Sequence, residues 1–126
     1  VNELRKARKE IYYCEKCNDA VRIPHIDAVI GPLTVSNFRK PTNLFKAITD
    51  DDCEAQYWFS ENSLKLITKT LVESGFDGIL CIGTPTVFEY FQSSLQLRRS
   101  IRSFLLDFDS RFVSYIQLLY YFRRIR

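Results

Sequence analysis

The sequence predicts an α/β fold in which two parallel strands are joined by a crossover helix. Two apolar runs indicate the strands: residues 78–82 end at Gly83, and residues 104–106 end at Asp107. Gly83 and Asp107 lie 24 residues apart, enough for one helix between the strands. This order predicts a right-handed crossover. Because parallel strands end at the same sheet edge, we expect Gly83 and Asp107 to face one ligand there.

Size and composition suit one folded domain, or one domain with an appendage. The chain has 126 residues, 46% of them hydrophobic, and a net charge of +3. Its basic residues cluster near 5–9, 98–102 and 123–126, where they either contact phosphates or form solvated helix faces. It begins with Val1 and contains no methionine, so we expect a fragment or a processed piece of a longer protein. We find no signal peptide and expect no membrane association.

A C-x-x-C pair near the N-terminus suggests a zinc half-site. Cys14 and Cys17 have the spacing of two zinc thiolates, and His25 is a candidate third ligand. Asp27 is the nearest candidate for a fourth, and Cys53 is a more distant one. A redox pair and a chance pair of thiols stay open as alternatives. The four cysteines do not form a disulfide framework, which is typical of a reducing compartment.

The N-terminal half reads as small or irregular elements. Residues 2–12 are charged and lack helix breakers, which predicts a helix. Residues 13–31 hold the cysteine pair, Pro24 and Gly31 and predict a small irregular knuckle. Residues 32–52 mix prolines with polar residues and predict a connecting arm rather than a packed element.

The C-terminal half has clearer signals. Residues 60–74 predict a helix, because Ser60 can cap its N-terminus and Gly75 can end it in a left-handed conformation. A buried strand follows at 78–82. Pro85 suits the first turn of the next helix, which we expect to end near residue 92. The second strand is predicted at 102–108.

The turn from Gly83 to Pro85 favours a ligand without phosphates. A dinucleotide site would need G-x-G-x-x-G, whereas this turn has one glycine and a proline without an N–H group. The adenosine part of S-adenosylmethionine needs only close backbone approach and a carboxylate for its ribose. Asp107 is nearer the strand end than Asp109 and is our choice for that carboxylate. The alternative is an ordinary strand–turn–helix in which Asp107 caps a nearby group.

An aromatic run precedes the helix at 60–74. It comprises Gln56, Tyr57, Trp58 and Phe59. One ring can stack on an adenine while Gln56 contacts the polar edge of the base. The alternative is core packing that anchors the arm on the sheet.

These motifs together resemble one known family. They are the cysteine pair, FRKPTNLF at 38–45, AQYWF at 55–59, GFDGILCIGTP at 75–85 and SFLLDFDSRF at 103–112. In this order they resemble the CCHC-type zinc-finger methyltransferases that modify an adenosine amine in large-subunit ribosomal RNA. The resemblance covers about residues 12–113. Residues 113–126 do not read like the family, and we interpret them as a truncated or misread gene end.

The resemblance implies a Rossmann-like S-adenosylmethionine domain preceded by zinc fingers that help to grip RNA. The cofactor site would then include residues 56–59, Gly83 and Asp107, with Thr86 where the family usually has arginine. Cys14 and Cys17 would be two zinc ligands. We therefore expect four segments: 1–31 with an N-terminal helix and zinc-knuckle-like segment, 32–59 as an arm with cofactor-lining aromatics, 60–112 as the first half of the methyltransferase domain, and 113–126 as an atypical tail.

The family's catalytic signature, Asp-Pro-Pro-Phe, does not occur in this sequence, so no catalytic residue is assigned. We expect a methyltransferase fragment that binds its cofactor but is inactive alone, in the nucleus, nucleolus or cytoplasm. Two other functions stay open: a zinc-dependent RNA-binding module with a degenerate enzyme fold, and part of a nicotinamide-dependent oxidoreductase.

Overall fold

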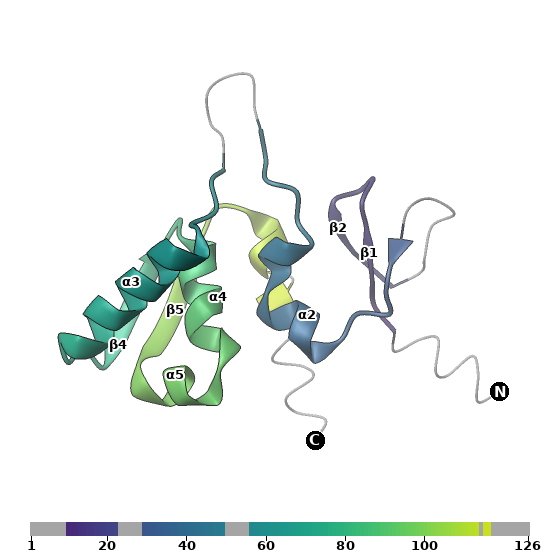
Figure 1. Ribbon diagram of the computed structural model, residues 1–126. Helices are drawn as coiled ribbons and strands as arrows, with labels where there is room; N and C mark the ends of the chain where they lie inside the picture. Colours follow the sequence, from purple (N-terminus) through teal and green to yellow (C-terminus); the bar gives the residue numbers. More distant parts are fainter. Residues whose placement is uncertain (1–9, 23–28, 50–55, 114, 117–126) are drawn as a thin grey trace. The chain divides into compact units, whose positions relative to one another are not determined.

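The computed structural model describes residues 10–22, 29–49, 56–113 and 115–116 (Figure 1). They belong to two compact units. One comprises the chain up to Lys46 together with the residues from Arg111 onward, and the other is Ala47–Ser110. Within the described ranges, no helix has the length and apolar character needed to cross a membrane. The division into four segments stays a prediction.

The first unit contains a small antiparallel sheet. Its strands are β1 (Tyr12–Cys14), β2 (Asp19–Val21) and β3 (Val29–Ile30), in the order β2-β1-β3. The region predicted as an irregular knuckle is therefore partly regular. Tyr13 and Cys14, both in β1, are almost fully buried, and this burial stabilises the strand. Most of the predicted helix at 2–12 lies outside the described residues, and Tyr12 already belongs to β1.

Residues 32–52 were interpreted as an unpacked arm, which was wrong for the described part, residues 32–49. This segment forms helix α2 (Val35–Arg39) and a short 3-10 helix, η1 (Pro41–Asn43). At the start of α2, Oδ1 of Asn37 accepts a hydrogen bond from the backbone N–H of the N-cap residue Thr34 (2.8 Å). Phe38 and Phe45 are 3% and 4% exposed, so burial of two large rings stabilises the segment. The prolines that suggested a loop are compatible with these short helices.

Aromatic rings form the core of this unit. Phe45 lies at the centre, with its ring centroid 4.6 Å from that of Tyr115 and 5.3 Å from that of Phe112. The guanidinium carbon of Arg111 lies 4.7 Å from the same centroid, in cation–π geometry. Residues near the start of the predicted tail therefore pack into a core, which explains their apolar character.

Two buried tyrosines should make the first unit sensitive to alkali. Burial raises the pKa of both Tyr13 and Tyr115 above the usual 10.0. The folded unit then holds protons that the unfolded chain releases, so the contribution of these two groups to stability is constant below about pH 10 and falls above it. The Tyr115 hydroxyl is buried with no hydrogen-bond partner in the described part of the chain. Urea unfolding of Tyr115→Phe should therefore show higher stability than the parent, by about 1 kcal/mol at neutral pH, and a smaller alkaline loss.

Tyr57 supplies the control for this prediction, since its side chain is 84% exposed. Tyr57→Phe should leave the alkaline loss unchanged. Equal pH profiles for the parent chain and Tyr115→Phe would contradict the assignment to Tyr115.

The second unit alternates helices and strands as predicted. Its elements in chain order are α3 (Glu61–Glu73), β4 (Gly78–Ile82), α4 (Pro85–Ser93), α5 (Leu95–Ser100) and β5 (Arg102–Leu106). The predicted helix at 60–74 is confirmed: Ser60 Oγ accepts the N–H of Ser63 at its start, and Gly75 follows its end at a φ of 75°. The strand at 78–82 and the helix from Pro85 are also confirmed.

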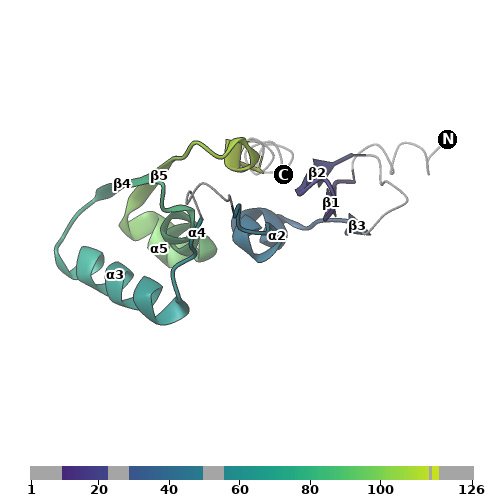
Figure 2. The same cartoon turned by 90° about the horizontal axis from the view of Figure 1, so that it is seen from above.

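Strands β4 and β5 pair in parallel, in register from Gly78 opposite Arg102 to Ile82 opposite Leu106. This confirms the parallel pair, although two strands do not make a complete Rossmann sheet. The three helices lie on one side of the pair (Figure 2). Their side holds the core of this unit, formed by Cys81, Val87, Phe91 and Ile101. The other side exposes four large side chains: Leu80, Ile82, Phe104 and Leu106.

Two details differ from the sequence prediction. Strand β5 ends at Leu106, two residues earlier than expected, because the chain turns there. Helix α5 was not predicted. It begins where Ser94 Oγ accepts the N–H of Leu97 (3.1 Å), a local cap within the crossover.

Candidate ligand-binding site

The candidate site lies in the second unit, where the two strands end. Gly83 directly follows β4 and has a φ of 60°, a left-handed conformation that favours glycine. Its backbone N–H donates to the carbonyl oxygen of Leu106 (2.9 Å), which extends the strand pairing by one step. Asp107 follows Leu106, so this hydrogen bond fixes Gly83 and Asp107 at adjacent strand ends.

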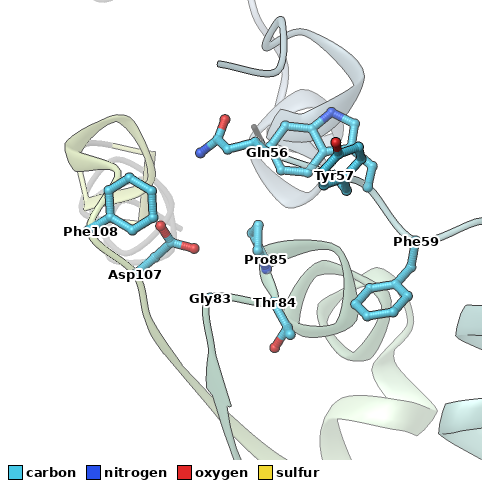
Figure 3. A pocket seen from close by; sticks show the side chains of 9 residues that line it. Gln56, Tyr57, Phe59, Gly83, Thr84, Pro85, Asp107 and Phe108 are labelled. Atoms are coloured by element: carbon cyan, nitrogen blue, oxygen red, sulfur yellow. The ribbon is translucent and has the colours of Figure 1, made fainter. Parts of the chain in front are cut away.

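A pocket of about 600 Å³ opens at this point. It is lined by Gln56, Tyr57, Trp58, Phe59, Gly83, Thr84, Pro85, Asp107 and Phe108. In Figure 3, Asp107 and Phe108 lie on one side, Gln56 and Tyr57 on another, and the turn from Gly83 to Pro85 between them. The structure thus brings together Gly83, Asp107 and the aromatic run, although their roles in binding stay predictions.

The aromatic run is held in place by its first residue. Gln56 donates its backbone N–H to the carbonyl oxygen of Ile48 (2.9 Å), and its Oε1 accepts the N–H of Ile48 (2.9 Å). Its Nε2 donates to Oδ2 of Asp109 (2.9 Å). Both ends of the Gln56 side chain therefore bond within the protein, while the Tyr57 ring is 84% exposed at the pocket.

Asp107 is the sole formally charged side chain among the lining residues. Its Oδ1 accepts the backbone N–H of Asp109 (2.9 Å), which orients the carboxylate. A half-buried carboxylate of this kind accepts hydrogen bonds from hydroxyl groups and repels anions. The pocket therefore suits a neutral or cationic ligand with hydroxyl groups better than one with phosphates.

Thr86 lies behind the pocket wall rather than in it. Its side chain is 6% exposed, and Thr86 is not among the lining residues. Its Oγ1 accepts the N–H of Phe59 (3.4 Å), so it tethers the aromatic run to the first turn of α4.

Sequence reasoning missed Phe108 and Asp109. Phe108 lines the pocket and is 80% exposed. It was missed because the strand was predicted to continue through residue 108, which made Phe108 a strand residue rather than part of the pocket edge. Asp109 is 5% exposed, and its Oδ2 accepts a hydrogen bond from Nε2 of Gln56. A large aromatic residue directly after Asp107 and a second acid two positions after it were the available signals.

The predicted zinc ligands lie in the first unit. Cys14 is buried, and its Sγ accepts the backbone N–H of Cys17 (3.4 Å) in the turn between β1 and β2. His25 and Asp27 lie outside the described residues. Among the residues that are described, no three His, Cys, Asp or Glu side chains gather as a metal site would require. Zinc binding stays a prediction.

Taken with its pocket, the second unit is an α/β arrangement with a candidate ligand site at the carboxyl ends of two parallel strands. Comparison with known proteins identifies the family. The sequence model of a family described as "Probable N6-adenine methyltransferase" matches residues 50–123, more than half of the chain. This protein belongs to that family. The match includes most of residues 113–126, which sequence reasoning had separated from the resemblance.

Three relatives from different species share the name rRNA N(6)-adenosine-methyltransferase ZCCHC4. The Xenopus tropicalis protein is 31% identical over 121 residues, which cover 87% of this chain and 24% of the relative. The Bos taurus protein is 29% identical over 107 residues, 79% of this chain and 21% of the relative. The Homo sapiens protein is 31% identical over 86 residues, 67% of this chain and 17% of the relative. The chain thus spans about a quarter or less of the length of these relatives.

Proposed function

We propose that this chain provides the cofactor-binding part of an S-adenosylmethionine-dependent methyltransferase that acts on an adenine amine in RNA. One observation carries the proposal: a single pocket contains the Gly83 turn, the Asp107 carboxylate and the aromatic run. The carboxylate would accept hydrogen bonds from the ribose hydroxyls, and the rings of Tyr57 and Phe108 would stack on the adenine. The left-handed turn at Gly83 would let the ligand approach the backbone.

The turn argues against a dinucleotide. A pyrophosphate binds to a helix N-terminus through backbone N–H groups. Here the N–H of Gly83 already donates to Leu106, and Pro85 has none. The Asp107 charge would also repel phosphates. A sulfonium ligand carries a positive charge at the sulfur that holds its methyl group. It needs no N–H donors for a phosphate and is not repelled by Asp107.

The RNA substrate is proposed from the relatives, whose name specifies ribosomal RNA. Such a substrate would place the protein in the nucleus, nucleolus or cytoplasm. The family's Asp-Pro-Pro-Phe signature does not occur in this sequence, so the residues present would hold the cofactor and leave the adenine amine to other residues. Within the chain we therefore assign ligand binding and no methyl-transfer step.

Calorimetric titration tests the proposal directly. We expect S-adenosylhomocysteine, the product form of the cofactor, to bind the 126-residue chain with a Kd at least about tenfold lower than that of NAD. Tighter binding of NAD would instead favour a nicotinamide-dependent oxidoreductase. RNA binding with a steep salt dependence and no response to S-adenosylhomocysteine would favour an RNA-binding module. Circular dichroism of the same sample confirms that the chain is folded.

A further inference from the structure

The pocket has two walls that come from distant parts of the chain. The aromatic run from Gln56 to Phe59 forms one wall, and Asp107 with Phe108 forms the other. The side chains of Gln56 and Asp109 connect these walls: Gln56 Nε2 donates to Asp109 Oδ2 at 2.9 Å. The two residues are 53 positions apart in the sequence, so this contact exists only in the folded unit.

The connection continues to both sides. On one side, Gln56 is joined twice to Ile48, through its backbone N–H and through Oε1, each at 2.9 Å. On the other side, the Asp109 N–H donates to Oδ1 of Asp107 at 2.9 Å. A line of hydrogen bonds therefore runs from Ile48 through Gln56 and Asp109 to the carboxylate that faces the pocket.

Burial strengthens the central hydrogen bond of this line. Asp109 is 5% exposed, and a buried carboxylate holds its hydrogen-bond donors strongly because water cannot replace them. Breaking the contact would leave a buried charge without this donor and would remove a direct link between the two walls. The Gln56–Asp109 hydrogen bond thus acts on the spacing between the walls in addition to the tether from Phe59 to Thr86.

We propose that Gln56 and Asp109 are positioning residues that set the distance between the aromatic wall and Asp107, and so determine how tightly the pocket holds an adenosine-containing ligand. This inference rests on the proposed function for the identity of the ligand. It assigns Gln56 a role through its contact with Asp109, and it adds Asp109 to the residues on which binding depends.

Reversing the hydrogen bond tests the proposal. Gln56→Glu places two carboxylates face to face and should weaken S-adenosylhomocysteine binding by at least about tenfold. Asp109→Asn keeps an acceptor for the Gln56 amide and should stay within about threefold of the parent. The double variant Gln56→Glu with Asp109→Asn restores an amide–carboxylate pair in the opposite direction. It should recover binding to within about threefold of the parent.

Fluorescence quenching measures the position of the aromatic wall without any ligand and accompanies the titration. Trp58 is the single tryptophan of the chain and lines the pocket, so quenching of its fluorescence by acrylamide reports the position of the aromatic wall. Quenching should increase in Gln56→Glu and return to the parent level in the double variant. A merely structural contact would alter thermal stability without this reversal.

Gln92 supplies a matched control in the same unit. Its Nε2 donates to Ser103 Oγ at 3.0 Å, and neither residue lines the pocket. Gln92→Glu should leave both the affinity and the quenching within about twofold of the parent. If the parent binds no S-adenosylhomocysteine, the proposed function fails, while the quenching series still decides the positioning role. Parent-like quenching in Gln56→Glu, or a double variant no better than Gln56→Glu, would overturn that role.

Discussion

Asp107→Asn is expected to weaken S-adenosylhomocysteine binding by about 10- to 100-fold, because hydrogen bonds to a charged acceptor are worth more than those to a neutral amide. The asparagine keeps an Oδ1 atom, which in the parent accepts the N–H of Asp109 at 2.9 Å, so the turn after β5 is preserved. The loss should therefore appear in ligand affinity rather than in stability. Calorimetry for the Kd and urea unfolding for stability separate the two effects.

Asp77→Asn is the control for this experiment. Asp77 precedes β4 at the opposite end of the strand, is largely exposed and forms an ion pair with Arg102 (3.5 Å). The same chemical change there should leave the ligand affinity unaltered. Parent-like affinity in Asp107→Asn would show that its carboxylate does not receive the ribose hydroxyls, and the assignment of this site would fail.

Phe91→Ala is expected to destabilise the second unit by about 3 to 5 kcal/mol. Phe91 is 0% exposed and packs in the core with Cys81, Val87 and Ile101. Removal of a fully buried ring loses its transfer free energy and leaves a cavity. Since domains are stable by only about 5 to 15 kcal/mol, much of this unit should unfold in mild urea.

Phe104→Ala provides the matched comparison. The Phe104 ring is 65% exposed on the side of the strand pair away from the helices. The same substitution should there change the free energy of unfolding by only about 0.5 kcal/mol. An equal loss for both variants would contradict the placement of the core, because it would require the Phe104 side to be buried as well.

Local signals were sufficient for most of the second unit. Ser60 and Gly75 mark the ends of α3, and an unbroken apolar run marks β4. These features act over a few residues, through backbone conformation and capping, so they are visible in the sequence. Helix α5 was missed because its signal is a single serine cap within a short connection.

The first unit was predicted less well for a physical reason. Residues 32–52 contain prolines and polar side chains that usually indicate a loop, yet Phe38 and Phe45 are buried. Their partners, Tyr13 and Tyr115, come from both ends of the chain. Packing of this kind depends on contacts between distant residues and leaves no local pattern.

The candidate site shows the same division. Gly83 and Asp107 could be paired from the sequence, because parallel strands must end at one edge. The placement of Phe108 at the pocket, of Thr86 behind it and of Asp109 beside Gln56 could not be predicted in this way.

The amino-acid order alone thus determined most of the helix–strand pattern of the second unit, the parallel pairing and the likeness to adenine methyltransferases. Capping and strand signals act locally, a crossover helix requires parallel strands, and the motifs are only a few residues long. Tertiary structure alone decided which side chains face the pocket and which support it from behind. That distinction depends on burial and on hydrogen bonds such as the one from Gln56 to Asp109, whose partners meet only after folding.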